Sequence, residues 1–142
     1  MTPEDLISIS HFSGTGYQPL VVFETWRVAV LRHCDELLPE QIDKFECHTE
    51  TDEVFILVQG RCILFLANVE DGVIQKIHAV DMEPKKLYNV RKGVYHTHTL
   101  DKDAHVIIVE NQDTGAENSL SLFLDHSHTV EIREITKNLW RA

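Results

Sequence analysis

Two histidines and one glutamate have the residue types and the spacing of a metal site. His48 precedes Glu53 by five positions, with a polar stretch between them, and His96 lies in a second histidine-containing segment further along the chain. Two imidazole nitrogens and one carboxylate oxygen form the facial set that holds a divalent transition metal and leaves positions open for a ligand. We therefore predict that Mn, Fe, Ni or Zn binds to His48, Glu53 and His96. The alternative is that these side chains only form hydrogen bonds with one another.

Three further polar side chains share a face with these residues if the segments are strands. Alternation places Lys44 and Glu46 on the side of His48, and His98 on the side of His96. Glu46, like His98, is a candidate catalytic acid or base. Alternatively, Glu46 forms a salt bridge with Lys44, His98 or Arg27, or contacts a substrate hydroxyl. His98 is then a satisfied interior histidine. Lys44 either holds a substrate carboxylate or phosphate or balances the charge of Glu46.

Arg27 and Tyr88 are the remaining candidates for substrate binding. Both lie in segments rich in branched or aromatic residues, and the sequence does not fix which way either side chain faces. Arg27 is also a candidate partner for Glu46. Cys47 and Cys62 are expected to pack in the core, because free cysteine is among the most buried residue types.

Short strands must position these residues. Runs of apolar or alternating residues recur between turn signals, at 20–31, 42–48, 54–59, 62–69, 73–80, 87–90, 96–100, 104–110 and 120–124. The Asp71-Gly72 dipeptide suits a tight type I′ hairpin turn. Residues 35–41 resemble a short helix, and residues 125–128 are expected to form a solvated turn. Many short strands separated by turns predict an all-β antiparallel sandwich or barrel.

The polar stretch 49–52 is expected to form a turn between two strands. If those strands pair as a hairpin, His48 and Glu53 are near neighbours across it. Before the turn, Phe45 and Cys47 point to the opposite face, where they pack as core residues. The polar face would line the interior of the barrel, where buried charge is costly unless it is paired or bound to metal.

Length and composition predict one domain over residues 1–142. The chain is 43% hydrophobic and 25% charged, which is ordinary for a soluble globular protein, and it contains no repeat or linker. Its net charge of −10 repels phosphate backbones and anionic lipid, so we expect neither nucleic acid nor a membrane surface as a partner.

The cysteines and the first residues predict a cytoplasmic location. The three cysteines form an odd set without close pairing, unlike a disulfide framework. The start of the chain lacks the basic and apolar regions of a signal peptide, and no apolar run has the length of a membrane span.

The spacing resembles the two sequence motifs of the cupins, which are small jelly-roll barrels. The first motif reads Gly-x5-His-x-His-x(3–4)-Glu-x6-Gly, and its second histidine, its glutamate and its closing glycine fall on His48, Glu53 and Gly60. The second motif reads Gly-x5-Pro-x-Gly-x2-His-x3-Asn, and its second glycine and its histidine fall on Gly93 and His96. The resemblance covers roughly residues 42–110, and residues 61–84 have the length expected between the motifs of a single-domain cupin.

The chain departs from the cupin pattern at Glu40, Glu46, Arg91 and Leu100, where the motifs have glycine, histidine, proline and asparagine. The change at Glu46 matters most, because that position is a metal ligand in the family. Carboxylate oxygen is acceptable to the same metals, so the resemblance makes Glu46 a candidate fourth metal ligand. A second carboxylate would neutralise a dication and polarise a bound water less, which disfavours hydrolysis and leaves room for substrate orientation and enolate stabilisation.

The resemblance implies an antiparallel jelly-roll (double-stranded β-helix) barrel with room for one small ligand. It also implies a metal-binding enzyme for a small polar substrate such as a sugar, sugar acid, keto acid or hydroxy acid, with isomerase, epimerase, lyase or dioxygenase chemistry. A non-catalytic binding or accessory protein with a degenerate metal site is the alternative. Because cupins usually pair through sheet edges or swapped strands, we expect a homodimer, with the apolar stretch 20–30 as a contributor.

Overall fold

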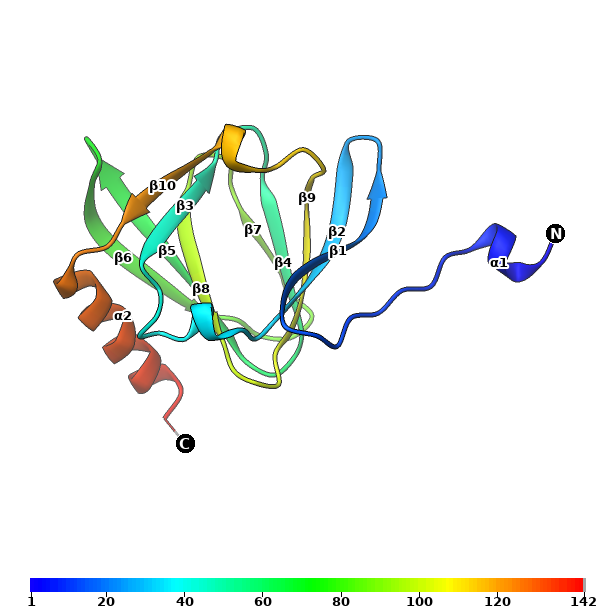
Figure 1. The fold of residues 1–142 in the computed structure, drawn as a ribbon. Coiled ribbons are helices and arrows are strands. Elements are labelled where there is room, and N and C mark those ends of the chain that lie inside the picture. The colour runs from blue at the N-terminus through cyan, green and yellow to red at the C-terminus, as the bar shows by residue number, and fades with distance from the viewer. Residues whose placement is uncertain (142) are drawn as a thin grey trace.

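Two antiparallel sheets of five strands each form the body of the protein, of which the computed structural model describes residues 1–141 (Figure 1). The strands are β1 (Gly16–Phe23), β2 (Trp26–Arg32), β3 (Lys44–His48), β4 (Glu53–Gln59), β5 (Cys62–Glu70), β6 (Val73–Asp81), β7 (Leu87–Val90), β8 (Tyr95–Leu100), β9 (His105–Asn111) and β10 (Ser119–Phe123). One sheet has the order β1-β2-β9-β4-β7, and the other has the order β10-β3-β8-β5-β6. The prediction of an all-β antiparallel barrel is confirmed.

Most of the predicted strands occur within a few residues of the expected bounds. Residues 87–90 form β7 as predicted, and the turn between β5 and β6 has positive φ at both Asp71 (50°) and Gly72 (74°). The single run expected over residues 20–31 is instead a hairpin of β1 and β2, in which Phe23 pairs with Trp26. Its apolar pattern is interrupted by the polar pair Glu24-Thr25, and Glu24 takes a positive φ of 45° in the turn.

The strands on either side of residues 49–52 do not pair as a hairpin. β3 pairs with β10 and β8, whereas β4 pairs with β9 and β7 in the other sheet. The turn is bonded to segments distant in sequence: Thr49 N–H donates to the carbonyl of Asn118 (2.9 Å), and Asp52 accepts from Lys92 N–H (2.7 Å). These contacts lead the chain from one sheet to the other, so His48 and Glu53 face each other across the barrel interior.

Apolar side chains pack in two layers. The inner layer lies between the sheets and contains Ala29, Leu31, Phe55, Leu57, Cys62, Leu64, Met82, Val90, Leu100, Ala104, Val106 and Ile108. The outer layer includes Ile42, Phe45, Ile63, Phe65, Ile77 and Ile132. Cys47 and Cys62 are buried as predicted. On β3, Phe45 and Cys47 are buried while the intervening side chains are partly exposed, which follows from the alternation of a strand.

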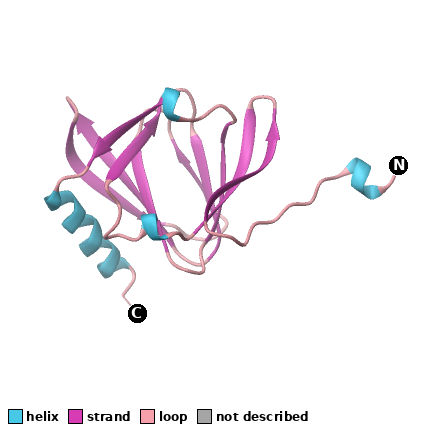
Figure 2. Ribbon diagram, in the orientation of Figure 1, coloured by secondary structure: helices cyan, strands magenta, loops and turns pink. Residues whose placement is uncertain are grey.

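Helices are short or lie outside the sheets, as Figure 2 shows. They are α1 (Pro3–Leu6), the 3-10 turns η1 (Asp35–Leu37) and η2 (Ala116–Asn118), and α2 (His126–Leu139). η1 occupies the first part of the predicted helix over residues 35–41. None of the helices in residues 1–141 has the length and apolar character needed to cross a membrane.

The prediction of a solvated turn at residues 125–128 is wrong, because these residues begin α2. The side chain of Asp125 accepts a hydrogen bond from the backbone N–H of His128 (2.9 Å) and so caps the helix. Aspartate favours both turns and helix N-caps, which explains the error. Ile132 is fully buried and anchors α2 to the outer layer beside Phe45.

The first residues extend away from the sheets (Figure 1). Ile7 and Ile9 in this segment are 60% and 89% exposed. β1, which follows it, lies at the edge of its sheet.

Candidate metal centre

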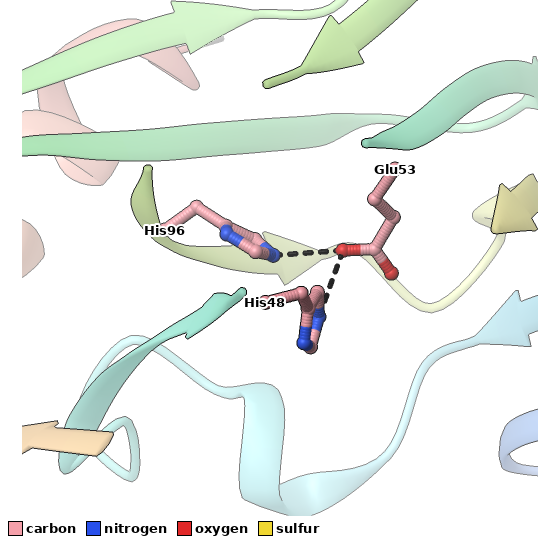
Figure 3. Close-up of side chains that lie close together, drawn as sticks. All are labelled: His48, Glu53 and His96. Carbon is pink, nitrogen blue, oxygen red and sulfur yellow. Dashed lines mark hydrogen bonds and ion pairs between the residues drawn. The ribbon is translucent and has the colours of Figure 1, made fainter. Parts of the chain in front are cut away.

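His48, Glu53 and His96 converge inside the barrel from three strands, as Figure 3 shows. The Nε2 atom of His96 lies 2.8 Å from Oε1 of Glu53, and Nε2 of His48 lies 3.3 Å from the same oxygen. One potential ligand atom from each residue lies within 4.8 Å of the other two. Glu53 comes from one sheet and both histidines come from the other, so the group spans the interior.

The ring nitrogen that points away from Glu53, Nδ1 (the outer nitrogen), also has a hydrogen-bond partner in both His48 and His96. Nδ1 of His96 lies 3.0 Å from the carbonyl oxygen of Val94, to which it can only donate. Nδ1 of His48 lies 2.8 Å from Oγ of Ser119. Histidines that bind metals are oriented in this way, because a bond at one nitrogen fixes the ring and leaves the other nitrogen for the ion. The residues present therefore fit a divalent metal.

Two glycines of the cupin-like motifs, Gly60 and Gly93, shape the backbone near His48, Glu53 and His96. Gly93 has a φ of +83°, and its N–H donates to the carbonyl of His48 (2.8 Å), which ties the approach to β8 to the end of β3. Gly60 has a φ of +75° at the end of β4, and a Cβ there would lie 2.5 Å from the backbone nitrogen of Ala104. Glycine is required at Gly60 for both conformation and space.

The charges of the group compensate one another. Burial acts to raise the pKa of Glu53, but hydrogen bonds from His48 and His96 outweigh it and hold the pKa below its usual range. The hydrogen bond to Glu53 raises the pKa of His48, against the effect of burial. The centre is therefore a buried carboxylate between two imidazoles, and it can exchange bound protons for a cation.

His98 lies beside the group but outside it. Its ring centroid is 5.6 Å from that of Phe55, and its Nδ1 atom is buried without a hydrogen-bond partner among residues 1–141. Burial, with a smaller contribution from the charge of His96, lowers the pKa of His98 to about 4. His98 is therefore neutral near pH 7, and it can accept or donate a hydrogen bond at the cavity wall.

Glu46 and Lys44 lie on the inner face of β3, as the alternation predicts. Their side chains are 44% and 40% exposed, and Nζ of Lys44 is 3.7 Å from Oε1 of Glu46. Glu46 does not belong to the close group of ligand atoms. Its position in this structure agrees with the predicted alternative of a salt bridge with Lys44.

Two cavities meet at the group. The first, of about 260 Å³, includes Glu36, Asp43, Thr97 and His98 in its wall, and the second, of about 440 Å³, includes Tyr17, Arg27, Glu110 and Ser119. Both are also lined by Lys44, Glu46, His48 and Glu53. A small molecule can therefore contact the candidate metal ligands from either side.

The structure separates Tyr88 from the other predicted site residues. Tyr88 lines a different, largely apolar cavity of about 220 Å³ together with Leu64, Leu66 and Val80. Its hydroxyl oxygen accepts a hydrogen bond from the backbone N–H of Glu83 (2.9 Å).

Glu110, Tyr17 and Ser119 are site residues that the sequence analysis did not identify. Glu110 accepts hydrogen bonds from Tyr17 and Arg27, so the guanidinium of Arg27 is already engaged. Burial and the neighbouring Glu53 raise the pKa of Glu110. The available signal was the alternation of the run 104–110, which places Glu110 on the same inner face as the buried Val106 and Ile108.

Comparisons with known proteins show similarity at the level of the fold. No family model and no curated protein sequence matches the chain. The nucleoside dehydratase Pac13 from Streptomyces, solved with uridine, has a TM-score of 0.54 and 12% identity, over 82% of this chain and 87% of Pac13. CapF has a TM-score of 0.54 and 16% identity, over 78% of this chain and 33% of CapF.

A cupin-2 domain protein from Shewanella frigidimarina matches with a TM-score of 0.48 and 17% identity, over 78% of this chain and 89% of that protein. At such identities, the matches bear on the fold alone. Two facing five-stranded antiparallel sheets, the position of the motif glycines and the similarity to Pac13 lead to one conclusion: the chain has the β-barrel fold of the cupins.

Proposed function

We propose that the protein binds a divalent transition metal through His48, Glu53 and His96 and acts on a small polar substrate beside it. The observation that carries this proposal is the convergence of three ligand atoms within 4.8 Å, on histidines whose outer nitrogens are already held. Mn, Fe, Ni and Zn all suit two imidazoles and a carboxylate. When bound, the metal supplies a Lewis acid for a substrate oxygen.

The chain's own residues then bind the substrate and move its protons. His98 is neutral and lines the first cavity, where its unpartnered Nδ1 can exchange a hydrogen bond with the substrate. Glu46, at the more exposed edge of both cavities, is placed to carry a proton between substrate and solvent. Lys44 and Arg27 contribute to the walls. Tyr88 has no part in this proposal, because it lines a separate cavity.

Among the reaction classes that the sequence leaves open, a lyase has additional support. Pac13, which shares the fold, is a nucleoside dehydratase. Loss of water from a hydroxylated substrate needs a group that removes a proton and a group that assists the departing hydroxyl. We assign these roles to His98 and Glu46, two of the titratable groups in the wall of the first cavity beside the candidate ligands.

A non-catalytic binding protein is the second candidate. Glu53 already forms a hydrogen bond with His96 at 2.8 Å and lies 3.3 Å from Nε2 of His48, so protons can satisfy the group as well as a cation can. Glu46 also stands where the cupin motif has a histidine ligand. Such a barrel would bind a small molecule without a metal.

Elemental analysis separates the two candidates. Untagged protein purified without chelator, with and without reconstitution, is compared with His48→Ala, His96→Ala and the exposed control His11→Ala. We expect near-stoichiometric metal in the wild type and His11→Ala, and its loss from the other two variants with unchanged circular dichroism. A wild type that takes up no metal after reconstitution would reject the metal centre in favour of the binding protein.

Two further properties of the protein, its oligomeric state and its location, are proposed. We propose a homodimer formed along the edge strand β1, where Val22 and Phe23 are 52% and 57% exposed. We also propose a cytoplasmic location, supported by three free cysteines, Cys34, Cys47 and Cys62. Subcellular fractionation tests the location, since recovery outside the cytoplasm would contradict it.

A further inference from the structure

Glu110 on β9 has one carboxylate oxygen that is fully engaged and one that is not. Its Oε1 accepts hydrogen bonds from the hydroxyl of Tyr17 (2.7 Å) and from Nη2 (2.7 Å) and Nε (3.2 Å) of Arg27. Its Oε2 is buried, no N–H or O–H group among residues 1–141 donates to it, and the side chain is only 3% exposed. Burial and the adjacent carboxyl group of Glu53 raise the pKa of Glu110, as expected for an acid that faces another acid without a donor between them. Buried polar atoms almost always have a partner, so this oxygen needs a specific explanation.

Glu110 stands directly beside the candidate metal centre. Arg27 pairs with Glu110 across β2 and β9, and Val54 pairs with Val109 across β4 and β9. Because β4 and β9 are antiparallel, Glu53 lies opposite Glu110, next to the pair Val54 and Val109. Arg27, Glu110 and Glu53 therefore form a row on the inner face of one sheet. Glu110 and Glu53 both line the cavity of about 440 Å³. A molecule in that cavity can therefore reach both residues at once.

The hydrogen bonds around Glu110 hold its carboxylate in one orientation. Arg27 also donates to the backbone carbonyls of Gln112 and Thr114, each at 3.1 Å, so its guanidinium is fixed on several sides. Burial and the bond to Glu110 raise the pKa of Tyr17, which keeps its phenol a donor. Both neighbours therefore donate to Oε1, and neither donates to Oε2.

The charges in the two cavity walls disfavour an anionic ligand. Five carboxylates contribute to the walls, from Glu36, Asp43, Glu46, Glu53 and Glu110. The basic side chains there are Lys44 and Arg27, and each is paired with a carboxylate, at 3.7 Å and 2.7 Å respectively. A divalent metal at the centre would add two positive charges, and the five negative charges would still exceed the four positive ones. A ligand carboxylate or phosphate would find no unpaired lysine or arginine among the described residues that line these cavities.

We propose that Glu110 binds a hydroxyl group of an uncharged, polyhydroxylated substrate, of which a sugar is the simplest example. A hydroxyl group can both donate and accept, so it suits Oε2 in either protonation state of Glu110. Carboxylates bind sugar hydroxyls in this way in dinucleotide-binding proteins. The inference rests on the proposed function for the placement of the rest of the substrate at His48, Glu53 and His96, and it sets sugar acids, keto acids and hydroxy acids aside.

Matched pairs of neutral and acidic sugars test this inference. Binding of D-ribose and D-ribonate, and of D-glucose and D-glucuronate, is measured by NMR titration of metal-reconstituted protein at millimolar ligand. We expect the neutral member of at least one pair to bind more tightly than its acid. Glu110→Gln should weaken that binding by about tenfold or more, as for loss of a hydrogen bond to a charged group. The exposed control Glu131→Gln should bind as the wild type does.

Glu110→Gln removes the ion pair of Arg27 and could therefore disturb folding. A second variant tests the inference without this change. Tyr17→Phe keeps that ion pair and removes only one bond to Oε1, so it should weaken neutral-sugar binding to a smaller extent. Tighter binding of both acids, absence of binding by both neutral sugars, or unchanged binding by both folded variants would overturn the inference.

Metal content measured on the same samples separates this inference from the proposed function. Wild-type protein that holds metal but shows no preference for the neutral sugars rejects the role of Glu110 alone. Wild-type protein that lacks metal yet binds a neutral sugar through Glu110 rejects the metal centre alone.

Discussion

At the scale of single residues, hydrogen bonds to the outer nitrogens decide how well the centre is ordered. The ring of His48 is held by Ser119, a residue 71 positions away in the sequence. Ser121, two residues further along β10, lines the same cavity and has no hydrogen bond to His48 among the described residues. The two serines therefore offer a matched comparison between an orienting hydroxyl and a merely neighbouring one.

Ser119→Ala should lower metal affinity by about 10- to 100-fold, the usual effect of removing a group that orients a metal-bound histidine. Ser121→Ala should leave it unchanged. Competition with a chromophoric chelator measures both affinities. Equal affinities in the two variants would show that the bond from Ser119 does not orient the metal-binding ring.

Protons and metal compete for His48, and the direction follows from its environment. Glu53 raises the pKa of His48 in the folded protein, so the stability gained from the protonated histidine is present at acidic pH and is lost as pH rises through the raised pKa. Metal binding requires the neutral ring. The increase in melting temperature on adding metal should therefore be larger at about pH 8 than at about pH 6. An increase that is the same at both pH values would argue against His48 as a ligand.

At the scale of elements, the ends of strands are fixed by backbone conformation and space. Gly60 ends β4 at a φ of +75°, with the backbone of Ala104 too close for any Cβ. Gly72, in the β5–β6 turn, has nearly the same φ (+74°) but has nothing within 4 Å of a built Cβ. Substitution at Gly72 therefore tests the free-energy cost of a positive φ alone, and substitution at Gly60 tests that cost together with steric overlap.

Gly72→Ala should destabilise the protein by about 1 kcal/mol, since it places a side chain in the left-handed region. Gly60→Ala should cost about 2–4 kcal/mol, because the same strain is joined by displacement of the backbone at Ala104. Chemical denaturation monitored by circular dichroism gives both values. Similar losses at the two positions would mean that the loop at Ala104 yields easily.

At the scale of the whole molecule, the sequence predicts which faces of the strands are polar better than which strands pair. The positions of His48 and Glu53 on inner faces follow from period-two alternation, and the two residues do meet. They meet between opposite sheets rather than across a hairpin, because pairing depends on contacts such as β3 with β10 that no local pattern encodes. The alternation of residues 104–110 indicates the inward face of Glu110, but its partner Arg27 is 83 residues away, so no local pattern indicates that the two residues pair.

The proposed homodimer belongs to this scale. Phe23→Glu, with a charge at the exposed edge of β1, should convert a dimer to a monomer in size-exclusion chromatography with light scattering, because charged edges oppose strand pairing. Val73→Glu alters a similarly exposed residue (57%) on β6, the edge strand of the other sheet, and should not change the mass. A monomeric wild type would exclude the dimer.

The centre draws Glu53 from one sheet and both histidines from the other. An ion coordinated by all three would act as a cross-link between the halves of the barrel, much as a disulfide joins distant segments of a chain. Removal of the ion should then increase the rate of amide hydrogen exchange in both β4 and β8. In this molecule, the chemistry of the site and the closure of its two halves would be governed by the same three side chains.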